Sequence, residues 1–248
     1  MRYQYDIIGE RYAESRSMAA FSAADTHTLL GALDELGGVR GLDTLDLACG
    51  HGDNTRLLAG GGARRTVGVD SSPELIRLAR EHGTGPERAD IEYLVADAAG
   101  LPDLGPFDLA TAVYLFNQAP DRGSLHAMFR SVRANLRPGA KLLAIVPNAG
   151  AFPHVDWSPY GVRILDRLRE GDAPLLKAHF VTEPPAPPVH FEYREWAHAD
   201  LAEAAVEAGF TTVGWQPTRT PPADPVRDEA YWTAYRAWPV SSLMTCTA

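Results

Sequence analysis

The 248-residue sequence predicts an α/β protein with a mostly parallel seven-stranded sheet, helices on both faces and a small insertion after the fifth strand. Over the first two thirds, short apolar runs alternate with helical patterns, which is typical of a parallel sheet. Each run is almost continuously apolar, as expected of strands that are covered on both faces. With 45% hydrophobic residues, the chain can bury a sizeable core.

Five strands and four helices are expected in this first part. The strands are predicted at Leu42–Leu47, Thr66–Val69, Ile91–Val95, Phe107–Tyr114 and Lys141–Val146. The helices are predicted at Asp25–Leu36, Asp53–Ala59, Ser72–Glu81 and Arg122–Leu136. Ser72 is a favourable N-cap with Pro73 in the first turn, and Pro138-Gly139 is expected to turn the chain into the fifth strand.

The end of the chain completes the predicted sheet. Strands are expected at Thr211–Trp215 and Val240–Thr245, beside helices at Ala199–Ala208 and Asp228–Ala237. Gly209 suits the position that follows a helix.

Residues 148–196 form a different region, which is rich in proline and aromatic residues. We expect a short helix near Tyr160–Arg169 and a hairpin of Lys177–Val181 with Val189–Arg194 around a Pro-rich turn at 184–188. The prediction is one domain over 1–248, with a helical cap at 1–38 and a substrate lid at 148–196.

Charge and cysteine content restrict the function. The net charge is −9, and no run of basic residues exceeds the pair Arg64–Arg65, which argues against nucleic-acid binding. Cys49 and Cys246 are too few for a disulfide framework. Neither an apolar leader at Met1–Glu10 nor a membrane-spanning run is present. We expect a cytoplasmic monomer or homodimer that acts on a small molecule, without a membrane or nucleic-acid partner.

The most informative segment is the turn Leu45–Gly52, with the sequence LDLACGHG. Gly50 and Gly52 allow a sharp bend and a close approach of a ligand to the backbone. The helix that follows would direct its N–H groups at this ligand. The turn therefore predicts a nucleotide-type ligand.

Two other nucleotide motifs fit this turn poorly. A dinucleotide fingerprint needs a third glycine or alanine, where Thr55 stands. A phosphate-binding loop needs Gly-Lys-Ser/Thr, which is absent. The carboxylate of Asp46 would repel a pyrophosphate but suits a ligand that carries ammonium and sulfonium charges.

Acidic residues also end the next two strands. Asp70 follows Gly50 by 20 residues, where a carboxylate can accept both ribose hydroxyls. Asp97, before Ala98, can receive the exocyclic amine of an adenine. Each could alone be a capping residue, but three acidic strand ends after a glycine turn favour one shared ligand.

Together with Val67–Ser71, Val95–Leu101, Phe107–Ala112 and Leu136–Val146, the turn resembles the motifs of class I S-adenosylmethionine (SAM)-dependent methyltransferases, which have a Rossmann-like fold. Tyr114–Pro120 and Glu229–Pro239 resemble the toxoflavin-synthase-type small-molecule methyltransferases. His51 and Asn117-Gln118 depart from the common pattern. The resemblance implies that carbonyl groups near Ala48 and Tyr114 hold the methionine ammonium, Asp70 the ribose, and Asp97 with Ala98 the adenine. The expected contacts to SAM, or to the product S-adenosylhomocysteine, are Tyr12, Asp46, Ala48, Gly50, His51, Gly52, Asp70, Ser71, Asp97, Ala98 and Tyr114.

The methyl acceptor is expected above the carboxyl end of the sheet. A sulfonium is already an activated methyl donor, so a general base is needed only if the acceptor atom keeps a proton. His154 and Tyr12 are the catalytic candidates, and no metal site is expected. The substrate candidates are Asn117, Asn148, Phe152, Trp157 and Tyr160. Their aromatic rings predict methyl transfer to an N or O atom of a small aromatic or heterocyclic compound, and the resemblance to toxoflavin-synthase-type enzymes implies that this compound is of natural-product type.

Other readings stay open at this point. A SAM-binding enzyme of the same fold can catalyse a different reaction, because function resides in the substrate pocket. A non-catalytic SAM-binding regulator is also compatible with the cofactor motifs. RNA methylation is disfavoured, because Asn117–Pro120 stands where a base-gripping Asp/Asn-Pro-Pro-Tyr motif is expected.

Overall fold

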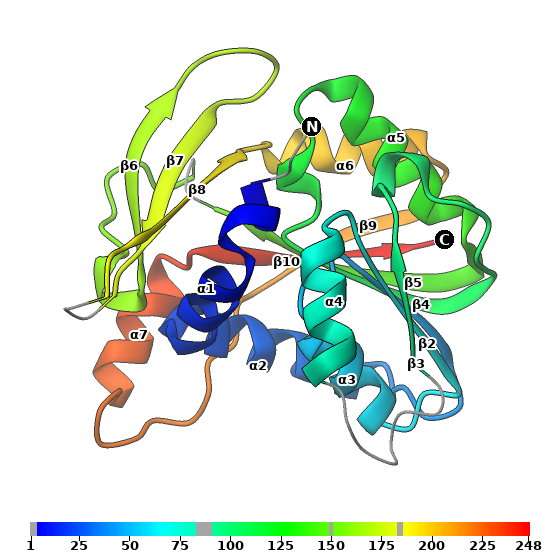
Figure 1. The fold of residues 1–248 in the computed structure, drawn as a ribbon, viewed down its shortest axis with the longest axis horizontal. Coiled ribbons are helices and arrows are strands. Elements are labelled where there is room, and N and C mark those ends of the chain that lie inside the picture. Colours follow the sequence, from blue (N-terminus) through cyan, green and yellow to red (C-terminus); the bar gives the residue numbers. More distant parts are fainter. Residues whose placement is uncertain (1–3, 83–90, 149–150, 183–185) are drawn as a thin grey trace.

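The computed structural model describes residues 4–82, 91–148, 151–182 and 186–248. Its centre is a seven-stranded sheet in the order β3-β2-β1-β4-β5-β10-β9 (Figure 1). Strands β1 to β5 are parallel, and β10 runs antiparallel to both β5 and β9. The predicted mostly parallel sheet is confirmed. Its strands are Asp43–Leu47 (β1), Arg65–Asp70 (β2), Ile91–Val95 (β3), Phe107–Val113 (β4), Leu136–Pro147 (β5), Thr212–Gln216 (β9) and Ser241–Thr247 (β10).

Helices cover both faces of this sheet. Ala112 and Val113 are neighbours on β4 and therefore point to opposite faces. Ala112 packs in a cluster with Phe129 of α5, and Val113 in a cluster with Leu58 of α3. The helices are Gln4–Met18 (α1), Ala20–Glu35 (α2), Asp53–Gly60 (α3), Pro73–His82 (α4), Arg122–Ala134 (α5), His198–Glu207 (α6) and Glu229–Ala237 (α7).

A second, three-stranded antiparallel sheet stands beside the first (Figure 1). It consists of β6 (Val162–Leu168), β7 (Leu175–Phe180) and β8 (Val189–Arg194). The predicted hairpin is confirmed, with Lys177 opposite Glu192. Residues 184 and 185 of its predicted turn lie outside the described residues.

The helix predicted near Tyr160–Arg169 is wrong, because this segment contains β6. The pairing of β6 with β7 shifts register between Ile164 and Asp166. A bulge of this kind interrupts the two-residue alternation of a strand. In the sequence, the apolar residues Ile164 and Leu168 are four positions apart, and this spacing also fits one face of a helix.

The predicted turn at Pro138-Gly139 is also wrong, because β5 begins at Leu136 and continues through it. Leu136 already pairs with Phe107 of β4, and the register shifts before the next pair. Gly139 has a φ of 83° and donates its N–H to the carbonyl oxygen of Ala248 at 2.7 Å. The Pro-Gly pair therefore forms an irregularity inside the strand.

The N-terminal segment forms two helices, α1 and α2, although the sequence pattern indicated only the later part of α2. α1 lies between α4 and β8 (Figure 1). Only Gly9 and Ala13 of this helix are buried, and the helix is held by the ring of Tyr12, which contacts Phe180 and Phe191, and by polar contacts. The Gln4 side chain exchanges hydrogen bonds of 2.7 and 2.9 Å with the backbone of Glu192. The hydroxyl of Ser72, which precedes α4, donates to Asp6.

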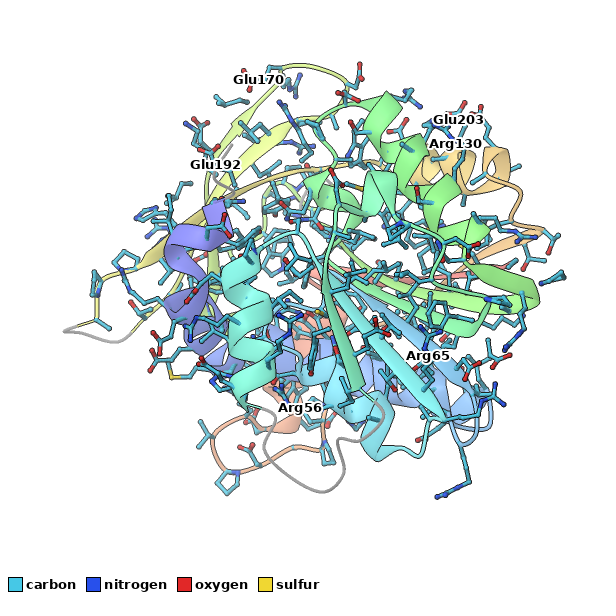
Figure 2. All side chains as sticks on the ribbon, turned by 45° about the vertical axis from the view of Figure 1, so that its right-hand side comes forward. Arg56, Arg65, Arg130, Glu170, Glu192 and Glu203 are labelled. Carbon is cyan, nitrogen blue, oxygen red and sulfur yellow. The ribbon has the colours of Figure 1, made fainter. Side chains whose placement is uncertain are left out.

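Charged side chains of both signs lie on the outside of the molecule. Figure 2 shows Arg130, Glu170, Glu192 and Glu203 at the periphery, and all four are exposed. Within the described residues, none of the helices combines the length and apolar character that a membrane span requires.

One buried carboxylate joins α2 to the strands behind it. Asp25 accepts hydrogen bonds from the hydroxyl of Tyr114, at 2.8 Å, and from that of Ser241 on β10. Burial raises the pKa of Asp25 to about 6, although the charge of Arg16 and these two hydrogen bonds oppose the shift. The carboxylate thus positions the Tyr114 ring at the end of β4 at some cost in stability.

The pH dependence of stability should report this cost. Asp25 binds its proton more tightly in the folded state than in the unfolded state, so its contribution falls as pH rises from about 4 to 6. A raise of about two pKa units corresponds to roughly 3 kcal/mol. Denaturant unfolding measures the free energy of unfolding at pH 4 and pH 7. From pH 4 to pH 7, wild type should lose about this much of that free energy relative to Asp25→Asn. Asp34→Asn, which changes an exposed residue of the same helix, should parallel wild type. A constant difference between wild type and Asp25→Asn would contradict the assignment.

Candidate functional site

The larger cavity, of about 410 Å³, lies at the carboxyl ends of β1 to β4. This volume is typical of sites for small-molecule ligands. Ligands of open parallel sheets bind at this edge, where neighbouring strands connect in opposite directions. Eight of the eleven predicted cofactor contacts line it: Tyr12, Ala48, Gly50, Asp70, Ser71, Asp97, Ala98 and Tyr114.

The backbone of the predicted turn opens toward this cavity. Gly50 has a φ of 56°, and a Cβ atom built on it would meet no heavy atom within 4 Å. Ala48 and Tyr114, with φ of 52° and 59°, are the only non-glycine residues with positive φ among the described residues. Such a conformation is strained and typically occurs at ligand sites. Both line the cavity, at the ends of the adjacent strands β1 and β4.

Asp70 connects the end of β2 to the glycine turn. Its two carboxylate oxygens accept hydrogen bonds from the N–H groups of Gly50 and Ser72, each at 2.9 Å. Burial raises the pKa of Asp70, while these backbone hydrogen bonds favour its charged form. Each oxygen keeps a free lone pair, so the carboxylate can accept two further hydroxyl groups.

Asp97 combines a capping role with a place on the cavity wall. It accepts a hydrogen bond from the N–H of Ala99 at 2.9 Å, at the start of a short 3-10 helix over Ala98–Gly100. Its side chain is exposed and lines the cavity together with the buried Ala98. Capping occupies one oxygen and leaves the other free for a ligand.

The remaining three predicted cofactor contacts lie outside the cavity wall. Asp46 is 1% exposed and accepts hydrogen bonds from Thr55 (2.6 Å) and Thr111 (2.8 Å), and burial raises its pKa to about 6. His51 instead pairs with Asp53 at 2.8 Å. A Cβ on Gly52 would lie 2.4 Å from the hydroxyl of Tyr93, so this glycine serves packing. Asp46 supports the turn from below instead of facing a ligand.

Two further polar side chains, Arg16 and Gln118, lie on this wall although neither is a predicted site residue. Arg16 alone is basic among the described residues that line the larger cavity, and its guanidinium lies 4.9 Å from the centre of the Tyr114 ring. Tyr5, Tyr12 and Arg16 are spaced by seven and four residues, which places them on one face of α1. Gln118 donates to the hydroxyl of Tyr5 at 3.0 Å. The spacing in α1 was the signal that could have revealed Arg16.

The charges on this wall suit a ligand of mixed charge. Asp70 and Asp97 supply two carboxylates, and Arg16 supplies one cation. A ligand that carries an ammonium, a carboxylate and several hydroxyl groups would find partners of opposite sign or hydrogen-bond acceptors here. The described residues contain no group of three or more His, Cys, Asp or Glu side chains arranged to hold a metal ion.

A smaller cavity of about 40 Å³ adjoins the larger one. Tyr5, Tyr12 and Tyr114 line both and therefore separate them. Half of the other lining residues come from β6, β7 and β8, and the walls are mostly apolar. Two of the predicted substrate residues, Asn117 and Trp157, belong to these walls. The Trp157 indole donates to the carbonyl oxygen of Trp238 at 2.8 Å, which fixes the ring.

The structure does not bring the other predicted substrate-side residues to either cavity. His154 is exposed, and both His154 and Phe152 contact the ring of Trp238. Tyr160 packs between aromatic rings of α7. Asn148 is buried and hydrogen-bonded to His198, Ser242 and Pro239. The chain after β5 packs against α7, so only Trp157 of this segment reaches the cavity wall.

Comparison with known proteins agrees with this geometry. Residues 44–139 match the family described as methyltransferase domain. A demethylmenaquinone methyltransferase of Lactococcus lactis subsp. lactis (strain IL1403) is 26% identical over 152 residues, or 60% of this chain and 59% of the relative. A trans-aconitate 2-methyltransferase of Azoarcus sp. (strain BH72) is 34% identical over 104 residues, or 42% and 38%. The chain thus spans only part of the length of these relatives.

The fold as a whole also has a solved counterpart. It is similar to a chain in the complex between the Haloferax volcanii Trm112 methyltransferase activator and the putative methyltransferase, with a TM-score of 0.66 and 19% identity. The match covers 100% of this chain and 99% of that chain. Residues 44–139 are therefore similar to a methyltransferase domain, and the whole chain shares its fold with a chain solved in complex with a methyltransferase activator.

Proposed function

We propose that the protein transfers a methyl group from SAM to an N or O atom of a small, flat aromatic or heterocyclic acceptor. The observation that carries this proposal is the junction of two cavities, one with acidic strand ends and one with aromatic walls, which share three tyrosines. The resemblance of Tyr114–Pro120 to toxoflavin-synthase-type enzymes supports a natural-product-type acceptor.

The larger cavity is the proposed SAM site. Asp70 would accept the ribose hydroxyls, and Asp97 with Ala98 would bind the adenine. The carbonyl groups of the strained residues Ala48 and Tyr114 would receive the methionine ammonium. Arg16 would pair with the methionine carboxylate, because it is the cation among the described residues of this wall. When bound, SAM supplies a methyl group already activated by its sulfonium.

The smaller cavity is the proposed acceptor site. Phe180, Phe191 and Trp157 surround it with rings, which favours a flat apolar acceptor. Demethylmenaquinone methyltransferase is one of the relatives, so methylation of a small organic acceptor has a precedent among similar proteins. The shared tyrosines would exclude water from the boundary where the methyl group crosses.

The titratable groups of the smaller cavity limit the acceptor chemistry. Among its described residues these groups are the tyrosines Tyr5, Tyr12, Tyr114 and Tyr193, and burial raises the pKa of each. They therefore stay neutral near pH 7 and cannot act as strong bases. Tyr12 would orient the acceptor through its hydroxyl. The acceptor atom should be one that needs little help to lose its proton, such as a heterocyclic nitrogen or an acidic phenol.

Cofactor selectivity provides the first test of this proposal. Two carboxylates on the wall repel a pyrophosphate, so S-adenosylhomocysteine should bind at least ~10-fold more tightly than NAD. Isothermal titration with both compounds measures the ratio. Tighter binding of NAD would overturn the SAM site.

Removal of the Asp70 carboxylate should weaken S-adenosylhomocysteine binding by about 2–3 kcal/mol, because charge-assisted hydrogen bonds to the ribose are lost. Asp70→Asn keeps one acceptor oxygen, so its affinity for S-adenosylhomocysteine should fall less than that of Asp70→Ala. Asp53→Ala is the matched control, since Asp53 lies beside the same turn but outside the cavity wall. An Asp70→Ala affinity within twofold of wild type would remove Asp70 from the site.

Turnover tests the acceptor side, with labelled SAM and a panel of phenols and nitrogen heterocycles. Tyr12→Phe should lower kcat/KM for the best acceptor by about tenfold, the effect of one lost hydrogen bond, while S-adenosylhomocysteine affinity stays near wild type. His154→Ala should turn over like wild type, because His154 contacts Trp238 and lies outside both cavity walls. Wild-type turnover of Tyr12→Phe, or a large loss in His154→Ala, would contradict this arrangement.

A further inference from the structure

One buried amide in the smaller cavity stands apart from the other buried asparagines. Asn117 is 5% exposed, lines the cavity, and its Oδ1 has no hydrogen-bond partner among the described residues. Asn135 is also buried, but its Oδ1 accepts from the N–H groups of Leu104 and Gly105, and its Nδ2 donates to two carbonyls. Asn148 likewise has partners for both ends of its amide.

An unpaired buried acceptor is uncommon in folded proteins and destabilises them. Asn117 belongs to a short 3-10 helix over Phe116–Gln118 that directly follows the end of β4. The ring of Phe116 stacks on that of Phe129 at 3.9 Å, which fixes this segment to α5. The amide is thus held at the cavity wall by well-packed neighbours, and its missing partner is not explained by a loose local structure.

The polar groups around Asn117 offer it no alternative partner. The amide of Gln118 faces the larger cavity and donates to the hydroxyl of Tyr5. Tyr12 interacts with Tyr5 and Arg16. The Tyr114 hydroxyl donates to Asp25 and the Trp157 indole to Trp238, and apart from these groups and Tyr193 the rest of the described wall is apolar. Within the described residues Oδ1 lacks a partner, and a donor on a molecule bound in the cavity would supply one.

We propose that Asn117 recognises a hydrogen-bond donor on the edge of the methyl acceptor. The acceptor class is then a flat aromatic or heterocyclic compound that presents an N–H or O–H group to Oδ1 of Asn117. This inference rests on the proposed function, because it takes the smaller cavity as the acceptor site. An analogue without the donor leaves Oδ1 unpaired in an apolar cavity, and it binds more weakly for that reason.

The test compares two pairs of probes that differ mainly in one donor: indole with benzofuran, and phenol with fluorobenzene. Their affinities are measured by ligand-observed NMR in the presence of saturating S-adenosylhomocysteine. Wild type should bind the probe with the N–H or O–H group about tenfold more tightly than its partner probe, as expected for one hydrogen bond. Asn117→Leu keeps the side-chain size, and it should bind the two probes of each pair with about equal affinity.

Thermal unfolding separates recognition from a structural role. Asn117→Leu should keep the wild-type Tm within ~2 °C or raise it, because the wild-type amide lacks a partner. Asn135→Leu is the matched control and should lower Tm by at least ~5 °C, since four hydrogen bonds are lost. A comparable loss in Asn117→Leu would show a structural amide and overturn the proposal.

The failures of the two proposals can be told apart. Equal binding of the donor and non-donor probes to wild type, or an unchanged preference in Asn117→Leu, overturns the role of Asn117 and leaves the acceptor cavity in place. If none of the four probes binds while S-adenosylhomocysteine does, the acceptor cavity itself is misassigned, and the inference about Asn117 falls with it.

Discussion

The left-handed backbone at the ends of β1 and β4 is the constraint on which the rest of the site depends. The chain leaves β1 toward β2 on one side, whereas β4 lies on the other side, so a crevice opens between these two strands. Ala48 and Tyr114 turn sharply at its two edges, in a conformation that non-glycine residues rarely adopt. Such strain persists only where the surroundings hold it. Here Asp70 fixes the glycine turn, and Asp25 fixes the ring of Tyr114.

The acids around the crevice form a set of decreasing burial. Asp46 is fully enclosed and hydrogen-bonded to two threonines, Asp70 is bonded to two backbone amides at the wall, and Asp97 is exposed. Burial raises the pKa of the first two. The negative charge that costs stability in the empty protein is placed where a ligand with positive charge and hydroxyl groups can offset it.

The sequence predicted the central sheet well because its signals are local. Apolar runs mark the strands, and the glycine turn with Asp70 and Asp97 marks the edge of the sheet where the larger cavity lies. Elements governed by distant contacts were missed. α1 buries only two small residues, so it has no apolar stripe to recognise, and β6 was read as a helix because a bulge disturbs its alternation.

The substrate side was harder for the same reason. His154 lies in the segment that follows β5, and the sequence alone predicts that it is near the crevice. The packing of this segment against Trp238 turns it outward. Asn117 was recognised as a substrate candidate from its place after β4. Its missing partner, however, depends on three-dimensional neighbours that no spacing reveals.

The position of α1 has a consequence for how molecules enter and leave. Tyr5 and Tyr12 of this helix face both cavities, and Arg16 faces the larger one. The helix is anchored at its beginning by Gln4 and Asp6, through contacts with two separate parts of the molecule. A displacement of this one helix would therefore open both compartments together. The two cavities therefore share this part of their wall, and a change in the position of the helix alters both.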